Sequence, residues 1–284
     1  MSFIEENGKN FISILSRYDN KKSSEKIHAY GVGAMKTGTH SITNVFSKFR
    51  SAHEPDVDCR MPISMAIERG EVSDKEINNF LYNRHMCLGY EFEASAMIVF
   101  YIENLIKIFP DSKFILTIRD CFSWLDSAIN YILNLRSLGI QERSGINNFY
   151  STRFGNPPLK YNKEEKILEL YGLNDIDGYF SYWKMHNEKI INSVPEEKLL
   201  IIETKNIRKQ LQDIADFIGV DISKLNEQGS HSFETPVKFN VIEKIDKEYL
   251  MDKAEFYCKH LMSKYIGLDP ASIRRRKVIN GSLA

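Results

Sequence analysis

A glycine-rich stretch near the start of the chain contains residues that could bind a phosphate group. Gly33 and Gly38 stand five positions apart, Lys36 lies between them, and Thr39 and His40 follow the second glycine. Backbone amides in such a turn point toward an oxyanion, and a lysine adds positive charge. In the triphosphate-binding loop the lysine and a hydroxyl residue follow the second glycine, and the hydroxyl holds Mg²⁺. Thr39 and His40 occupy those positions here, so we expect a phosphate loop whose motif supplies no Mg²⁺ ligand.

A second pair of residues could hold another phosphate. Arg119 ends the apolar run KFILTIRD, and Ser127 follows eight residues later in a segment of helical periodicity. A guanidinium offers a charged fork to phosphate, and a serine hydroxyl adds one more donor. The alternative is a surface ion pair between Arg119 and Asp120, together with a glycine turn whose lysine is only solvated.

The two motifs together resemble those of the sulfotransferases that use 3′-phosphoadenylyl sulfate (PAPS). The resemblance implies that Lys36–Ser41 binds the 5′-phosphosulfate and that Arg119 and Ser127 bind the 3′-phosphate. It also implies PAPS as donor, adenosine 3′,5′-bisphosphate (PAP) as product, no metal, and a lysine that stabilises charge on the departing phosphate. It covers about residues 27 to 220 and departs at Met35 and Cys121, where relatives often have proline. The implied donor-binding residues are Lys36, Thr37, Gly38, Thr39, His40, Ser41, Arg119 and Ser127.

An attacking hydroxyl group needs a base that accepts its proton. Glu54, with His53 as second choice, follows the first predicted helix, where the resemblance places the base of related enzymes. Glu91 and Glu93 are further candidates for base or acceptor contact, and they share one face if their segment is a strand. The alternative for each carboxylate is a solvated or capping residue. Four other histidines are interpreted as ordinary: His28, His85, His231 and His260.

Other donor contacts are less specific. Tyr182 and Trp183 could stack on adenine, although aromatic residues at helical spacing are more typical of a core. Lys238 or the basic run 274–277 could add charge beside the 3′-phosphate, but a charge run near a terminus is usually solvated.

Alternating strand and helix patterns position these groups. A strand is predicted from about Ile27, with a helix at 41–49, and the strand 113–120 lies between helices at 102–109 and 122–133. A third strand at 198–204 precedes a helix that ends at Gly219. Such repetition predicts the α/β class: a three-layer, mainly parallel β-sheet flanked by helices, which by resemblance is the P-loop-like sulfotransferase fold. Ligands of such sheets bind at the carboxyl ends of the strands.

The 284 residues are 43% hydrophobic, with 38 acidic and 38 basic residues. We expect a single domain over 1–284, with an N-terminal lead at 1–26 and an irregular insertion at 136–177 that is either an acceptor lid or a surface excursion. The balanced charge argues against nucleic acid and anionic membranes as partners. Four scattered cysteines and the polar N-terminus favour a cytoplasmic location. The oligomeric state is left open.

The expected function is transfer of the sulfuryl group from PAPS to a hydroxyl of a small metabolite, lipid or carbohydrate. One alternative is a P-loop nucleotide kinase with a degenerate motif. Another is a non-catalytic nucleotide-binding protein.

Overall fold

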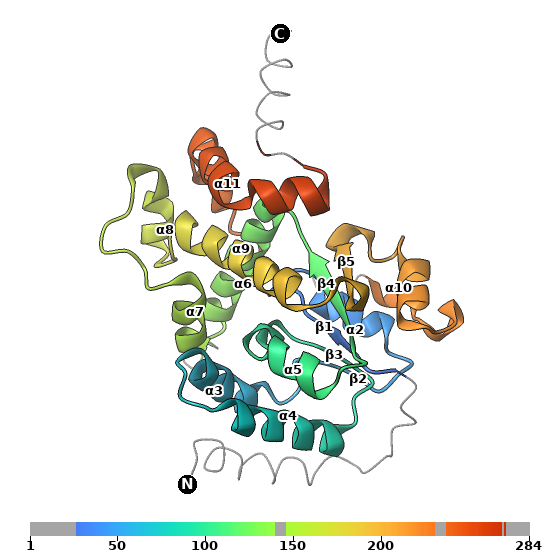
Figure 1. Cartoon of the computed structure of the whole chain (residues 1–284). Helices are drawn as coiled ribbons and strands as arrows, with labels where there is room; N and C mark the ends of the chain where they lie inside the picture. The colour runs from blue at the N-terminus through green and yellow to red at the C-terminus, as the bar shows by residue number, and fades with distance from the viewer. Residues whose placement is uncertain (1–26, 140–145, 231–236, 269, 271–284) are drawn as a thin grey trace. The chain divides into compact units, whose positions relative to one another are not determined.

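The computed structural model describes residues 27–139, 146–230, 237–268 and 270 (Figure 1). They form two compact units. The first unit holds the described residues up to Thr117 and those from Lys189 to 230. The second holds Ile118–Glu188 and the described residues from 237 onward. The expectation of a single domain stays a prediction.

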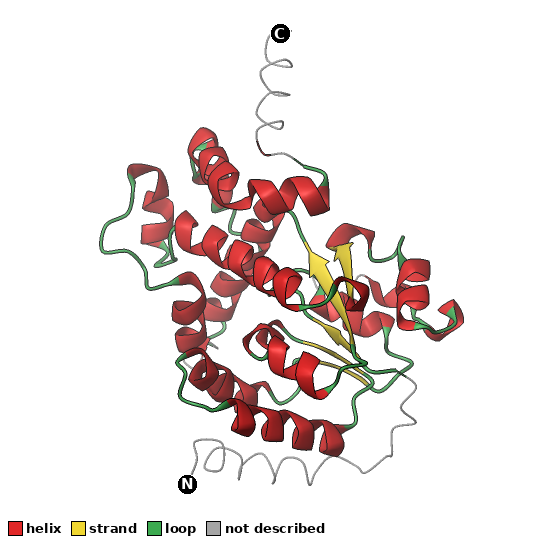
Figure 2. Cartoon of the chain, viewed as in Figure 1, coloured by secondary structure: helices red, strands yellow, loops and turns green. Residues whose placement is uncertain are grey.

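A five-stranded sheet organises the first unit, with the order β2-β3-β1-β4-β5 (Figure 2). β1 runs parallel to β3 and to β4, and β2 runs parallel to β3. Tyr30 of β1 lies opposite Glu93 of β3 and Phe114 of β4. The mainly parallel sheet is therefore confirmed. The strands are β1 (Ala29–Gly31), β2 (Ser51–His53), β3 (Phe92–Ala94), β4 (Lys113–Ile118) and β5 (Leu199–Glu203).

Helices cover both faces of this sheet (Figure 1). Neighbouring strand residues point to opposite faces, so Tyr30 and Phe114 join one core while Ala29 and Ile115 join the other. Burial on both faces explains why the strands read as apolar runs. The three layers confirm the α/β class. One face carries α3 (Val57–Glu68), α4 (Asp74–Leu88) and α5 (Ile102–Ile108), and the other carries α2 (Thr39–Val45) and α10 (Leu211–Ile218).

Helix ends in the first unit follow local chemistry. α4 begins with a capping box, in which the Ser73 side chain and Glu76 satisfy each other's backbone amides. α10 ends at Gly219, whose φ of 84° is left-handed, as predicted for a glycine stop. α2 ends at Val45, earlier than predicted, because Phe46 leaves the helix and the chain turns there.

The second unit is helical around aromatic side chains. Its described helices are α6 (Cys121–Ser137), α7 (Ile146–Phe154), α8 (Lys166–Leu170), α9 (Ile176–Ser193, which continues into the first unit from Lys189), α11 (Lys247–Leu261) and a π-helical turn (Met262–Ile266). The rings of Phe154 and Tyr179 pack with centroids 4.7 Å apart, and Tyr182 packs beside Trp124.

The expectation that residues 136–177 are irregular was partly wrong. α7 lies inside this range because Tyr150 and Phe154 are buried and their rings stack 5.6 Å apart, a driving force that scattered charges obscure in the sequence. α8 is a second short helix inside this range. The lead at 1–26, His231 and the basic run 274–277 lie outside the described residues. Within the described segments, no helix has the length and hydropathy to cross a membrane.

Candidate active site

The glycine-rich loop lies between β1 and α2 and is shaped by close contacts. A Cβ atom on Gly33 would lie 2.2 Å from the Thr117 hydroxyl oxygen and 2.4 Å from that of Thr37, so only glycine fits. Thr37 is fully buried, and its hydroxyl donates to the Ala34 carbonyl at 2.7 Å. The Thr37 side chain therefore serves the loop's own structure.

The second half of the loop turns through two left-handed residues. Gly38, the N-cap of α2, has a φ of 91°, and a Cβ there would meet the Thr204 methyl group at 2.9 Å. Lys36 has a φ of 62°, which is strained for a residue with a side chain. The Thr204 hydroxyl donates to the Thr37 carbonyl at 2.6 Å and holds the turn from outside. Lys36 is half-buried and stands inside the turn.

His53, at the end of β2, meets the first turn of α2. Its Nε2 lies 2.9 Å from the Thr39 hydroxyl oxygen, and its ring centroid is 5.0 Å from that of His40. Burial, with the nearby His40, Arg60 and Lys36, lowers the pKa of His53 to about 4. His53 is therefore neutral near pH 7. Ser41 follows in the same turn of α2 and is half-buried.

Glu54 follows β2 in a strained turn. Its φ is 46°, that of Asp56 is 50°, and both values are left-handed. The Glu54 amide donates to the Ala94 carbonyl at 2.9 Å. Burial raises the pKa of the Glu54 carboxyl, against the opposing effects of Arg60 and the Ala96 amide. A carboxyl of raised pKa is a stronger base than an ordinary carboxylate, which suits it to accept a proton.

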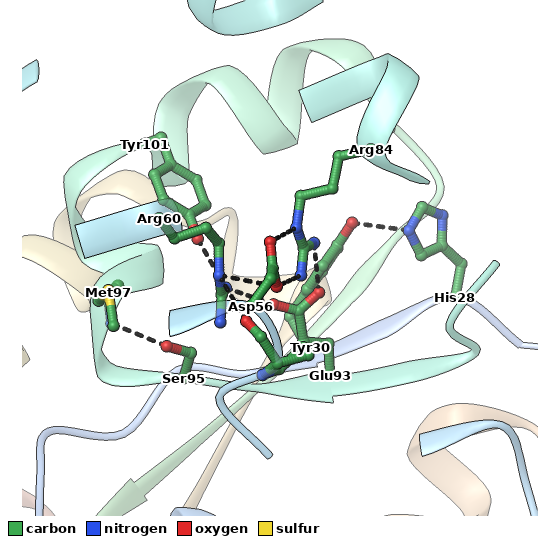
Figure 3. A network of polar contacts seen from close by, with 10 residues as sticks. His28, Tyr30, Asp56, Arg60, Arg84, Glu93, Ser95, Met97 and Tyr101 are labelled. Carbon is green, nitrogen blue, oxygen red and sulfur yellow. Dashed lines mark hydrogen bonds and ion pairs between the residues drawn. The ribbon is translucent and has the colours of Figure 1, made fainter. Parts of the chain in front are cut away.

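A buried ion network lies beside this turn (Figure 3). Arg60 of α3 binds Glu93 of β3 at 2.5 Å, and Arg84 of α4 binds the other Glu93 oxygen at 2.6 Å. Arg84 also binds Asp56 at 2.8 Å, and Arg60 lies 3.3 Å from the same carboxylate. The four side chains are at most 7% exposed, so breaking one pair would leave an uncompensated buried charge.

The alternative carboxylates have other partners. Burial alone would raise the pKa of Glu93, but the guanidinium groups of Arg84 and Arg60 outweigh it and hold the pKa below its ordinary value. Glu91 is buried and accepts a hydrogen bond from the Arg50 amide at 2.9 Å. The two carboxylates are thus held by an ion pair and by a backbone amide.

Arg119 and Ser127 belong to the second unit. Arg119 Nε donates to the Ser123 hydroxyl at 3.0 Å, and the Trp183 indole donates to the Arg119 carbonyl at 3.0 Å. Burial lowers the pKa of Arg119, against the neighbouring carboxylate of Asp120. Ser127 is half-buried one helical turn beyond Ser123 on α6, so both hydroxyls share a face. Arg119 thus contacts Ser123, a serine that the sequence analysis did not name, and the assignment of Arg119 and Ser127 to a phosphate stays a prediction.

Several supporting residues were missed in the sequence. Trp183 and Tyr182 are buried core residues, in agreement with the core interpretation, and Trp183 also holds the backbone of Arg119. The sequence analysis did not single out Arg60 or Arg84. The one available signal is the four-residue spacing from Asp56 to Arg60, which fits an ion pair in the first turn of a helix. Lys238 lies among the described residues, and its assignment to the 3′-phosphate stays a prediction.

A profile of the sulfotransferase domain matches residues 30–228. The chain belongs to the sulfotransferase domain family. No curated protein sequence matches it significantly. A solved sulfotransferase from Alicyclobacillus acidocaldarius is 16% identical, with a TM-score of 0.46, over 88% of this chain and 99% of that chain.

Within this sulfotransferase domain, the candidate catalytic residues follow the ends of β1 and β2. The loop with Lys36 and the turn with His53 and Glu54 are joined by the contact between Thr39 and His53. The arrangement places a cation, a neutral imidazole and a carboxyl of raised pKa on adjacent segments. Such a set can hold an anionic group and accept a proton.

Proposed function

We propose that this protein transfers the sulfuryl group from PAPS to a hydroxyl group of a small metabolite, lipid or carbohydrate. The observation that carries the proposal is the glycine loop, which holds Lys36 inside the turn and is joined through Thr39 to His53, the residue before Glu54. A triphosphate enzyme needs its lysine after the second glycine. The family match supports the same reaction class.

The residues of the loop fit a phosphosulfate group. Gly33 and Gly38 keep side chains out of the turn, so backbone amides and Lys36 can approach an anion closely. We assign Thr39, His40 and Ser41 to the same end of the donor, and Thr37 to it only through its backbone. Arg119 and Ser127 are assigned to the 3′-phosphate, which a guanidinium and a hydroxyl suit. Arg119 follows Thr117, a residue of the loop's wall, by two positions in the chain.

We assign the base to Glu54. It takes the proton of the acceptor hydroxyl as the oxygen attacks sulfur, while the fixed charge of Lys36 stabilises the departing phosphate. His53 is neutral at physiological pH and is the second candidate for this role. The reaction as proposed uses no metal ion.

The surroundings of the reaction are proposed on weaker grounds. Balanced charge supports a small or carrier-bound acceptor over nucleic acid or an anionic membrane. The described cysteines are free, which supports a reducing compartment such as the cytoplasm.

Two measurements test the proposal. Thermal-shift titrations should show that PAP stabilises the protein without metal and that ATP with Mg²⁺ does so less. Incubation with PAPS and a panel of hydroxylated acceptors should then release PAP, and Glu54→Gln should suppress that release.

The alternatives predict different results. Stronger stabilisation by ATP with Mg²⁺ than by PAP would identify a nucleotide kinase. A non-catalytic nucleotide-binding protein would bind PAP but would not turn over PAPS with any acceptor or with water. In that case Glu54→Gln would leave PAP binding unchanged.

A further inference from the structure

Arg60 leaves one hydrogen-bond donor without an acceptor. Its Nε donates to the Pro55 carbonyl at 3.0 Å, and its Nη1 donates to Glu93 at 2.5 Å and to the Tyr101 hydroxyl at 3.0 Å. Its Nη2 is buried and has no partner among the described residues. This nitrogen extends away from the carboxylates of the network (Figure 3). A buried charged donor without an acceptor is costly, so its persistence needs a reason.

Glu54 belongs to the turn that Arg60 holds through the Pro55 carbonyl. The Pro55 carbonyl, which receives Arg60 Nε, directly follows Glu54 in the chain. Glu54 and Asp56, on either side of Pro55, both have left-handed backbone conformations, with φ of 46° and 50°. Arg60 also acts electrostatically on the Glu54 carboxyl.

The charges around the turn balance without Glu54. Asp56 and Glu93 offset Arg60 and Arg84, so the four-residue network is neutral as a group. Other titratable or charged groups near the turn, among the described residues, include His53 of β2, with His40 and Lys36 acting on it, and Tyr101, whose hydroxyl accepts from Arg60. An ionised Glu54 therefore adds a negative charge that needs a donor of its own.

We propose that Arg60 is a positioning residue, whose Nη2 receives the Glu54 carboxylate when Glu54 ionises and so holds the base in its proton-accepting state. This role rests on the proposed function of Glu54 as the base. The donor that lacks an acceptor in the protonated state gains one in the ionised state. Loss of the proton and capture of the carboxylate are thus one event.

Arg84 provides a matched control. It is buried in the same network and shares both carboxylate partners, Asp56 and Glu93. Its Nε, Nη1 and Nη2 all donate to those carboxylates, at 3.0, 2.6 and 2.8 Å. A change at Arg84 therefore disturbs the network without removing the donor assigned to Glu54.

The test follows the ionisation of Glu54 directly. Protein labelled with ¹³C at the glutamate carboxyl carbon gives one signal that Glu54→Gln removes, and this signal is titrated against pH. Arg60→Lys keeps the positive charge but removes the Nη2 donor, so the titration midpoint of the Glu54 carboxyl should move to higher pH. Arg60→Gln, which also loses the charge, should move it further, and Arg84→Lys should leave it near the wild-type value. Equal midpoints in Arg60→Lys and Arg84→Lys would overturn the proposal.

A second measurement needs no change at Arg60, in case those variants do not fold. In wild-type protein labelled with ¹⁵N at arginine, the Arg60 Nη2 resonance should shift with the same midpoint as the Glu54 carboxyl. It should not shift in Glu54→Gln over that pH range, and a signal constant in the wild type would refute the assignment. Neither titration requires PAPS, so failure of PAPS turnover would remove the proposed function while leaving this coupling measurable. In the turnover assay, the acid limb of the pH profile should move to higher pH in Arg60→Lys and stay in place in Arg84→Lys.

Discussion

Replacing Gly33 by alanine should distort the phosphate loop through one clash. The φ of Gly33 is not positive, so its backbone would accept alanine, and the effect comes from contacts alone. The new Cβ would lie 2.2 Å from the Thr117 hydroxyl oxygen, 2.4 Å from that of Thr37 and 2.9 Å from the Thr117 carbonyl oxygen. Overpacking of this kind costs about 1–3 kcal/mol. Displacing the Thr37 hydroxyl from Ala34 and from Thr117 adds about 1 kcal/mol for each hydrogen bond.

The expected loss is therefore about 3–5 kcal/mol of unfolding free energy, or a melting temperature lower by at least about 6 °C. Gly70→Ala is the control, because Gly70 has a φ of 69° and nothing within 4 Å of a new Cβ. Its cost is backbone strain alone, about 1–2 kcal/mol. Differential scanning calorimetry measures both stabilities, and isothermal titration with PAP should show weaker binding only for Gly33→Ala.

The double variant Gly33→Ala/Thr117→Ala isolates the clash. Because it removes the nearest contact, its cost should fall below the sum of the two single variants by about 1 kcal/mol or more. Additive costs, or a Gly33→Ala melting temperature equal to that of Gly70→Ala, would show that the contacts with Thr37 and Thr117 do not shape the loop.

Four further outcomes follow from the site. Lys36→Ala should lower PAPS turnover by about 10²–10³-fold, as for other fixed groups that stabilise transition-state charge, with an unchanged melting temperature. Arg119→Ala should weaken PAP binding by about tenfold or more, since hydrogen bonds to charged groups contribute about 1.5–3 kcal/mol; equal affinities by titration calorimetry would contradict its assignment. Glu54→Gln should raise the melting temperature near pH 8 and leave it unchanged in acid. A carboxyl whose folded pKa is raised costs the protein stability as pH rises through that pKa, and glutamine removes this cost. His53→Asn should lose less stability than the wild type as pH falls from about 6.5 toward 4. A histidine whose folded pKa is lowered destabilises the fold as the unfolded state takes up its proton over this range. Parallel plots of melting temperature against pH for the two proteins would contradict this.

The sequence predicted the parts of the fold that local patterns specify. β4 and β5 are apolar runs because both faces of a parallel sheet are buried, and Gly219 ends α10 because it adopts a left-handed φ. β2 has only three residues, Ser51–His53, and reads as a polar loop. Its place in the sheet depends on pairing with β3, which no local pattern reveals.

The site was predictable to the same degree. The glycine spacing and Lys36 mark the loop, and Glu54 and His53 were predicted as base candidates because the family resemblance places the base after the first predicted helix. The partners of these residues come from distant segments: Arg84 lies 28 positions from Asp56, and Thr204 lies 167 positions from Thr37. A charged residue on a helix reads as solvated surface until the fold shows that it is buried, and for that reason the network was missed.

Backbone strain in the described segments concentrates at this site. Of the four non-glycine residues with positive φ there, three are Lys36, Glu54 and Asp56. Each such conformation costs roughly 1–3 kcal/mol and persists only where the surroundings hold it. Thr37 and Thr204 hold the first, through hydrogen bonds to the Ala34 and Thr37 carbonyls, and the arginine network holds the turn that contains the other two. The network therefore does more than offset its own charges: through Pro55 and Asp56 it holds the turn that carries the carboxyl assigned as base.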